Sequence, residues 1–147
     1  MNTTTNTANL DHIQDIFDDF EYMTEWEDKY TYIIDMGKNL EPIDDTYKTE
    51  EYKVKGCMSQ VWLVLDHNKT KEAESTHKVY FKADSDAIIV KGLVALLLKI
   101  YSGQKRDNIK NINIEQIFDK LGLSSHLSPI RRNGFYSMVE KIKAYTT

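Results

Sequence analysis

The segment AIIVKGLVALLLKIY, residues 87–101, contains the longest apolar run of the chain, from Gly92 to Leu98. Its apolar side chains cover most of the circumference of a helix, which is typical of an element buried on more than one side. Ser102 and Gly103 end the pattern. We therefore predict a buried central helix over residues 87–101. The run is far shorter than the roughly 20 residues that cross a bilayer, so no membrane span is predicted.

Two amphipathic helices are predicted before this segment. Between Leu10 and Met23, apolar residues recur at the spacing that places one stripe on a helix. Thr24 and Glu27 then have the spacing of a capping box, so a second helix should begin near Thr24. It should end at Gly37, because glycine readily adopts the left-handed conformation that follows many helices.

Strand patterns lie between these helices and the central one. After a loop over residues 39–51, apolar and charged residues alternate from Tyr52 to Lys55, and residues 60–66 are rich in strand formers. Residues 77–83 alternate again and predict a third strand. A group of sequential strands flanked by helices indicates an α+β fold, with a small antiparallel sheet of about three strands covered by helices.

The remainder of the chain is predicted to be helical. Residues 107–121 indicate one or two short helices that end at Gly122, and Ser128 followed by Pro129 is typical of the start of a last helix. Residues 1–9 are rich in Thr and Asn and are expected to be disordered. We therefore expect a disordered tail over residues 1–9 and one domain over residues 10–147.

Composition excludes several classes of protein. The 147 residues include one cysteine, so no intramolecular disulfide can form, and a closed zinc site, which takes about four Cys or His ligands, would need scattered histidines. The net charge of −4, with no basic block, argues against nucleic-acid binding and favours proteins or small molecules as partners. No phosphate-binding glycine loop is present. A lone thiol stays reduced in the cytoplasm, where we expect the protein to be located.

Cys57 is the main candidate for chemistry. It follows Gly56 at the expected tip between two strands, and Lys53 and Lys55 are close enough in sequence to favour a thiolate, the reactive form of cysteine. Two alternatives remain open: an inert, buried cysteine in an interaction module, and the nucleophile of a hydrolase that would use one of the histidines. The candidate histidines stand in no recognisable motif and are His67, His77 and His126, with His12 less plausible.

Charged side chains supply further candidates. Asp84 and Asp86 could form an acid–base pair, but the expected role of both is to cap the central helix. Arg131 and Arg132 fall in the first turn of the last helix, where the helix dipole disfavours cations. This placement suggests a function, although exposed arginines often only solvate a surface.

Four blocks of the chain carry a resemblance to a known family. Residues 54–63, VKGCMSQVWL, resemble the V-x-G-C-x-S-x-V-W signature of the SufE family of sulfur acceptors. Three further blocks are similar to the family's patterns in the same order: residues 30–40, residues 83–93 (ADSDAIIVKGL) and residues 127–134 (LSPIRRNG). The departures are small: Glu41 replaces a small residue or proline, Met58 replaces a frequent polar residue, and Ile130 replaces a serine.

The resemblance implies a sulfur relay. Cys57 would receive sulfur from the persulfide of a SufS-like, pyridoxal-phosphate-dependent cysteine desulfurase, stimulate that enzyme, and pass the sulfur to an iron–sulfur scaffold complex. The protein itself would be no enzyme, would bind no cofactor or metal, and would be a monomer or a homodimer. Arg131 would steady the anionic sulfur or contact the desulfurase, unless it forms a structural ion pair. The other implied supporting residues, which shape the loop, cap the helix or face the partner, are Gly56, Ser59, Gln60, Trp62, Asp84 and Asp86.

Overall fold

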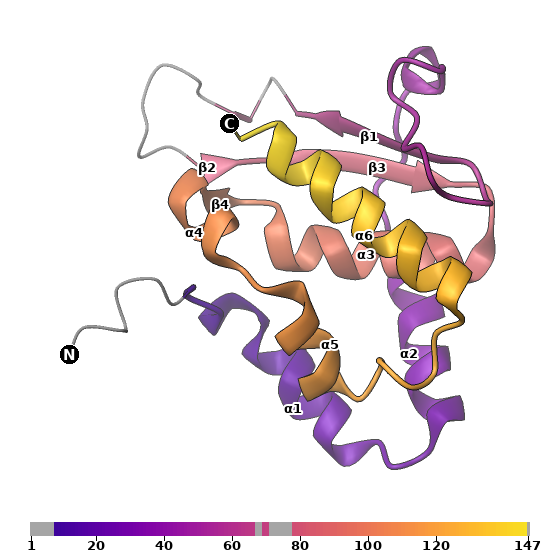
Figure 1. The fold of residues 1–147 in the computed structure, drawn as a ribbon, viewed down its shortest axis with the longest axis vertical. Coiled ribbons are helices and arrows are strands. Elements are labelled where there is room, and N and C mark those ends of the chain that lie inside the picture. The colour runs from indigo at the N-terminus through magenta and orange to yellow at the C-terminus, as the bar shows by residue number, and fades with distance from the viewer. Residues whose placement is uncertain (1–7, 67–68, 71–77, 147) are drawn as a thin grey trace.

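The computed structural model describes residues 8–66, 69–70 and 78–146 (Figure 1). Its order of elements places two helices first, then strands around a long helix, then three more helices. The elements are η2 (Asp11–Ile13), α1 (Gln14–Tyr22), α2 (Trp26–Lys38), η3 (Asp45–Tyr47), β1 (Val61–Leu65), β2 (Lys78–Val79), β3 (Phe81–Ser85), α3 (Ile88–Tyr101), β4 (Gln104–Lys105), α4 (Arg106–Asn111), α5 (Ile114–Leu121) and α6 (Pro129–Ala144). The predicted α+β class is confirmed.

The predicted central helix, α3, is confirmed as the middle of the fold. It packs against α2 on one side and against β3 and α6 on others, and nine of its residues are buried. Figure 1 shows α3 between the sheet and the pair α1 and α2, with α6 crossing in front. The apolar surface of α3 is therefore covered by three kinds of neighbour, as its sequence pattern indicates. Ile88 is the exception, with 71% of its surface exposed at the first turn.

Among the described residues the strands form two small antiparallel sheets of two strands each. β1 pairs with β3 from Val61 opposite Ser85 to Leu65 opposite Phe81, and β2 pairs with β4. The expected strand over residues 52–55 is reduced to one bridge between Lys53 and Trp62. The strand is no longer than this because turns at residues 49–53 come before the segment and the turn at Gly56 follows it. His77, where the third strand was expected to begin, lies outside the described residues.

Several helix ends follow the predicted chemistry. Gly122 ends α5 with a left-handed φ of 73°, and the Ser128 hydroxyl accepts a hydrogen bond from the Arg131 amide at 3.2 Å at the start of α6. The predicted capping box at Thr24 is wrong, because α2 begins at Trp26 after Glu25 and has no side-chain cap. The first seven residues, most of the expected tail, lie outside the described range, and Asn9 is hydrogen-bonded to Asn108.

Gly37 has a different role from the expected helix end. It lies within α2, and a Cβ built on it would lie 2.7 Å from the amide nitrogen of Gly92 in α3. A Cβ on Gly92 would lie 2.4 Å from the carbonyl oxygen of Ile33. These neighbours are backbone atoms, which cannot rotate away. The two glycines therefore allow α2 and α3 to pack closer than larger residues would permit.

Replacing Gly92 with alanine should destabilise the fold. Alanine normally stabilises a helix relative to glycine by about 0.5–1 kcal/mol, but here the Cβ meets backbone and must push α2 and α3 apart. We expect Gly92→Ala to lower the free energy of unfolding in urea by about 1–3 kcal/mol. Thr31→Ala, on the exposed side of α2, is the control and should be neutral or stabilising. Equal stability of Gly92→Ala and the wild type would refute the close contact.

Candidate functional site

Cys57 lies in a short segment, the cysteine loop (residues 55–60), which leads into β1. Gly56 has a φ of 95°, a conformation that favours glycine, and this places Cys57 against α6. The Cys57 thiol donates to the Gly134 carbonyl oxygen at 3.5 Å. A Cβ on Gly134 would lie 3.3 Å from Cys57 Sγ, and one on Gly56 would lie 2.6 Å from the Ser137 hydroxyl oxygen. Small residues on both sides therefore allow the loop to sit directly on α6.

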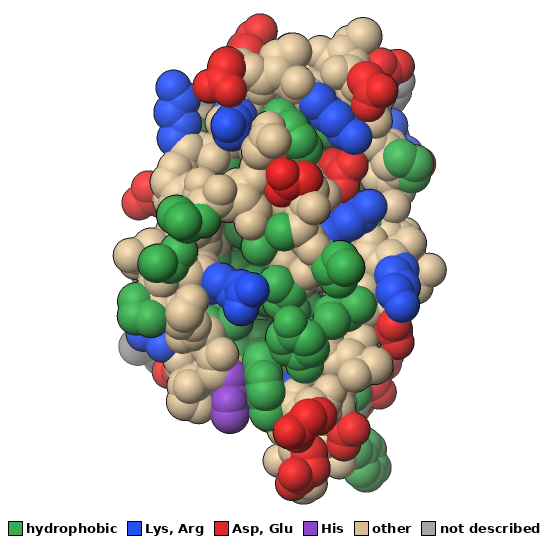
Figure 2. Space-filling view, turned by 90° about the vertical axis from the view of Figure 1, so that its right-hand side faces the viewer, with side chains coloured by type: hydrophobic (Ala, Val, Ile, Leu, Met, Phe, Trp, Pro, Cys, Tyr) green, Lys and Arg blue, Asp and Glu red, His purple; other side chains and the backbone are tan. Residues whose placement is uncertain are grey.

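The half-buried Cys57 faces a pocket of about 330 Å³ between the cysteine loop, α3 and α6. The wall is mainly apolar. Figure 2 views the side of the molecule where α3 and α6 begin, and hydrophobic side chains gather there around a basic one. The lining residues are Cys57, Met58 and Ser59 from the loop, Val90 and Leu93 from α3, and Ser128, Ile130, Arg131, Gly134 and Met138 from α6 and its cap.

The resting thiol is not activated by its neighbours. Burial raises the pKa of Cys57 above its ordinary value, because a half-buried thiolate would lose hydration. The expected help from Lys53 and Lys55 is absent: Lys53 Nζ pairs with Glu50 at 3.5 Å, and Lys55 is exposed. In this arrangement Cys57 is held as an uncharged thiol.

Asp86 fastens the end of the cysteine loop to the segment before α3. Its carboxylate accepts from the Gln60 amide at 3.0 Å and from the Gln60 side chain at 3.4 Å. Its own amide donates to the Gln60 carbonyl oxygen at 3.2 Å. Asp86 therefore does not cap α3, contrary to the prediction. Gln60 is thereby held at the end of the cysteine loop, and Ser59 lines the pocket.

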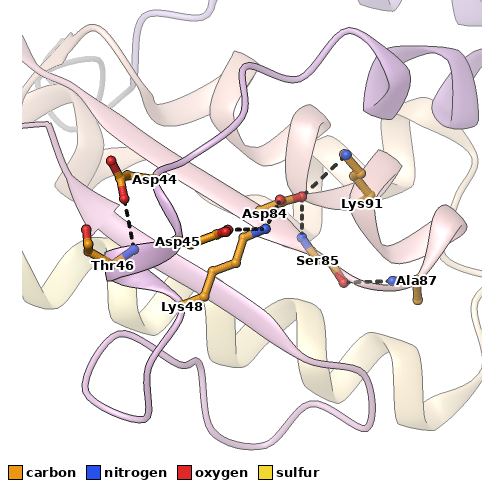
Figure 3. Close-up of polar contacts among 8 residues, drawn as sticks. All are labelled: Asp44, Asp45, Thr46, Lys48, Asp84, Ser85, Ala87 and Lys91. Atoms are coloured by element: carbon orange, nitrogen blue, oxygen red, sulfur yellow. Dashed lines mark hydrogen bonds and ion pairs between the residues drawn. The ribbon is translucent and has the colours of Figure 1, made fainter.

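Asp84 is also not a helix cap. It lies in β3, which continues to Ser85, so Asp84 is too far before α3 to accept hydrogen bonds from the first amides of that helix. The residue at the cap position is Ala87, whose side chain makes no capping hydrogen bond. The Asp84 carboxylate is 3.3 Å from Lys48 Nζ and 3.5 Å from Lys91 Nζ (Figure 3). Asp84 and Asp86 have separate partners, which does not favour an acid–base pair.

The Asp84 ion pair with Lys48 holds a surface loop to the sheet, and the ion pair with Lys91 joins the sheet to α3. Asp84 is the main cause of the raised pKa of Lys48, whose ammonium also lies 5.7 Å from the ring centroid of Trp62. Trp62 is the cross-strand partner of Asp84 and is 9% exposed. Asp44 caps η3 by accepting from the Thr46 amide at 2.9 Å. Trp62 and Asp84 thus support the sheet beneath the site and do not line its pocket.

The two arginines at the start of α6 differ in their surroundings. Arg131 lines the Cys57 pocket and forms no ion pair among the described residues, so the structural ion pair considered for it is not found there. Arg132 instead donates to the Ser124 carbonyl oxygen in the preceding loop. Arg131 thus brings an unpaired positive charge to the pocket that holds Cys57.

No described histidine reaches Cys57. His12 Nε2 is 2.8 Å from the Ile100 carbonyl oxygen, and the His126 ring stacks on Trp26 at a centroid distance of 4.5 Å. His67 and His77 lie outside the described residues. Within the part of the chain that the structure describes, no three His, Cys, Asp or Glu side chains could hold a metal ion, and no helix could span a membrane.

Several residues that line the pocket were not predicted from the sequence to do so. Val90, Leu93 and Met138 were expected only as core residues, and Gly134 stood in a matched block without an assigned role. Apolar periodicity indicates that such residues are buried, but not which loop they face. The glycine in the first half of the last helix was the one available signal, because an unnecessary helical glycine suggests a close approach.

Fold and site together define a small α+β protein that presents one thiol at an apolar pocket. The chain belongs to the SufE family: the family model described as "Fe-S metabolism associated domain" matches residues 14–146. The predicted family is therefore confirmed, and the match places the chain in Fe–S metabolism.

Individual proteins support the assignment. An uncharacterized SufE-like protein of Rhizobium meliloti is 46% identical over 132 residues, which cover 90% of this chain and 92% of that protein. Another, from Rhizobium etli, is 43% identical over 136 residues, covering 92% and 88%. A solution structure of a hypothetical protein from Thermus thermophilus has a TM-score of 0.71 at 16% identity, covering 92% and 93%. At that identity the likeness concerns the fold.

The buried thiol predicts a specific pH dependence of alkylation. Because only the thiolate reacts, the rate with iodoacetamide should rise about tenfold per pH unit below the pKa. The midpoint should be higher in the folded protein than in the urea-unfolded chain, where Cys57 is hydrated. Mass spectrometry of the peptide containing Cys57 measures both rates, and no mutation is needed because the chain has one cysteine. A lower midpoint in the folded protein would contradict the effect of burial.

Proposed function

We propose that Cys57 is a sulfur carrier, which accepts sulfur from the persulfide of a SufS-like cysteine desulfurase and passes it to an iron–sulfur scaffold complex. The observation that carries the proposal is the position of the single thiol at an apolar pocket that is also lined by Arg131, which forms no ion pair with any described residue. Membership of the SufE family supports the same role. The described histidines lie away from the thiol, which favours sulfur transfer over hydrolysis.

The transfer is an exchange at sulfur. The Cys57 sulfur attacks the outer sulfur of the donor persulfide, a new S–S bond forms, and the S–S bond within the donor breaks. The donor's inner sulfur leaves with the electron pair of the broken bond and takes up the proton that Cys57 loses. Electrons and protons balance, so the step needs no oxidant, metal or bound cofactor on this chain. Pyridoxal phosphate would belong to the desulfurase, which generates the persulfide.

The pocket residues suit this chemistry. Arg131 can offset the negative charge of an anionic persulfide, and its guanidinium stays charged at every physiological pH. The apolar walls from α3 and α6 limit the access of water and reductants to the carried sulfur. The raised pKa of Cys57 keeps the resting thiol protonated, and the thiol form is less susceptible to oxidation than the thiolate. On this proposal the protein works in the reducing cytoplasm as a partner that stimulates a desulfurase.

Sulfur loading of Cys57 tests the proposal directly. Incubation with an active SufS-like desulfurase and cysteine should add the mass of one sulfur atom to the peptide that contains Cys57. The desulfurase rate should rise to saturation with increasing concentration of the carrier. Cys57→Ser should abolish both effects, because its hydroxyl cannot form a persulfide. An unchanged peptide mass while the desulfurase is turning over would overturn the proposal, and ester or amide hydrolysis without a desulfurase would favour the hydrolase alternative.

Arg131 should contribute to transfer in a way that Arg132 does not. We expect Arg131→Gln to slow sulfur transfer to Cys57 about tenfold, since one charge-assisted contact contributes about 1.5–3 kcal/mol. Arg131→Lys should restore part of the rate because it keeps the charge. The matched control is Arg132→Gln, which changes the neighbouring arginine that contacts the Ser124 carbonyl instead of the pocket.

The measurement is the single-turnover rate of loading, followed by mass spectrometry, with urea unfolding to record the stability of each variant. Arg132→Gln should affect stability more than transfer. Equal transfer rates for wild type and Arg131→Gln would show that the charge of Arg131 has no part in the reaction.

A further inference from the structure

Two large aliphatic side chains are exposed at the mouth of the Cys57 pocket. Met58 directly follows Cys57 in the cysteine loop and is 82% exposed, and Ile130, in the first turn of α6, is 56% exposed. Both line the pocket, together with Arg131. They come from segments far apart in the sequence, so their meeting at one opening is a property of the fold.

The fold itself does not require apolar residues at these two positions. Both side chains are largely in water, where a polar residue would fit equally well. Both are also positions where the chain departs from the resembled pattern, which has a frequent polar residue after the cysteine and a serine before the arginine. Single exposed apolar side chains are ordinary, but two beside one reactive thiol are typical of a surface that a partner covers.

We infer that Met58 and Ile130 determine which desulfurase this chain accepts, an inference that rests on the proposed function. They would be covered by an apolar segment of the desulfurase, the one that carries its persulfide cysteine. Geometry and charge indicate that the segment covering this surface is the one that carries the donor persulfide. The outer sulfur of the donor must come into contact with Cys57 Sγ through this opening, and Arg131 in the same wall complements the negative charge of a persulfide. A polar donor segment would place polar groups against the apolar side chains of Met58 and Ile130.

The double variant Met58→Gln/Ile130→Ser tests this inference. It introduces polar side chains at these two positions while keeping Cys57, Arg131 and the other residues that line the pocket. We expect the concentration that half-saturates stimulation of the desulfurase from the same organism to rise at least about tenfold, because both polar side chains would lose the apolar contact with the donor segment. Loading of Cys57 from a small donor, glutathione persulfide, should fall less than loading from the desulfurase, because the small donor does not need the apolar contacts.

Two control variants separate the pocket mouth from general effects. Tyr22→Ser removes another exposed apolar side chain, 88% exposed at the end of α1 and outside the pocket, and should leave half-saturation unchanged. Met58→Leu/Ile130→Val keeps the apolar character and should stay close to the wild type. Size-exclusion chromatography should show the same oligomeric state for all variants. A change of state in Met58→Gln/Ile130→Ser alone would mean that a second copy of this chain covers the surface, and would overturn the inference.

The outcomes distinguish this inference from the function on which it rests. Unchanged half-saturation in the double variant, with sulfur still transferred from the desulfurase to Cys57, would overturn the inference and leave the proposed function intact. Loss of loading from glutathione persulfide as well would show that the double variant damages the thiol site. That result would also overturn the inference. A wild-type Cys57 that takes no sulfur from the desulfurase would overturn both.

Discussion

The contact between Gly37 and Gly92 is the constraint on which the other layers depend. It sets α2 directly against α3, because the backbones of the two helices meet at these glycines. The remaining faces of α3 are then free to support β3 and α6, and to supply Val90 and Leu93 to the Cys57 pocket. A wider separation would shift α3 relative to its other neighbours, because packed interiors transmit such strain. The position of the pocket wall thus depends on two glycines that do not themselves line the pocket.

The cysteine loop is positioned by three different kinds of contact. The left-handed Gly56 turns the backbone, the small residues Gly134 and Ser137 let the loop approach α6, and Asp86 holds Gln60 at the far end. Each contact acts on a different point of the loop, so the position of Cys57 is determined from both sides. The result is a half-buried thiol held against a helix at the edge of a pocket, an arrangement that suits the proposed carrier.

Local chemistry allowed much of the fold to be predicted from the sequence. Apolar periodicity located the helices, and Gly122, Ser128 and Pro129 marked their ends correctly because those signals act within a few residues. The predictions were wrong where tertiary contacts decide the role of a residue. Glycine is typical of a helix end, but Gly37 makes a close contact with α3 instead. Aspartate is typical of a helix cap, but Asp84 lies within β3. The sequence also singled out Cys57 and Arg131, but only the fold brings them to one pocket, together with Gly134 and Met138.

Burial acts on only one of the two chemical groups of the pocket, since Cys57 is half-buried and Arg131 is exposed. It disfavours the Cys57 thiolate, which raises the pKa of the thiol, and no described residue pairs with Arg131. An empty carrier therefore has an uncharged sulfur beside an unmatched cation. In the proposed transfer, the incoming persulfide supplies the missing negative charge, so the site becomes electrostatically balanced only when sulfur arrives. Since a partner covering the opening also removes water, this attraction strengthens on docking. On this proposal the coupling would make the reaction faster in the docked state than in the free carrier, whose thiol is disfavoured as a thiolate.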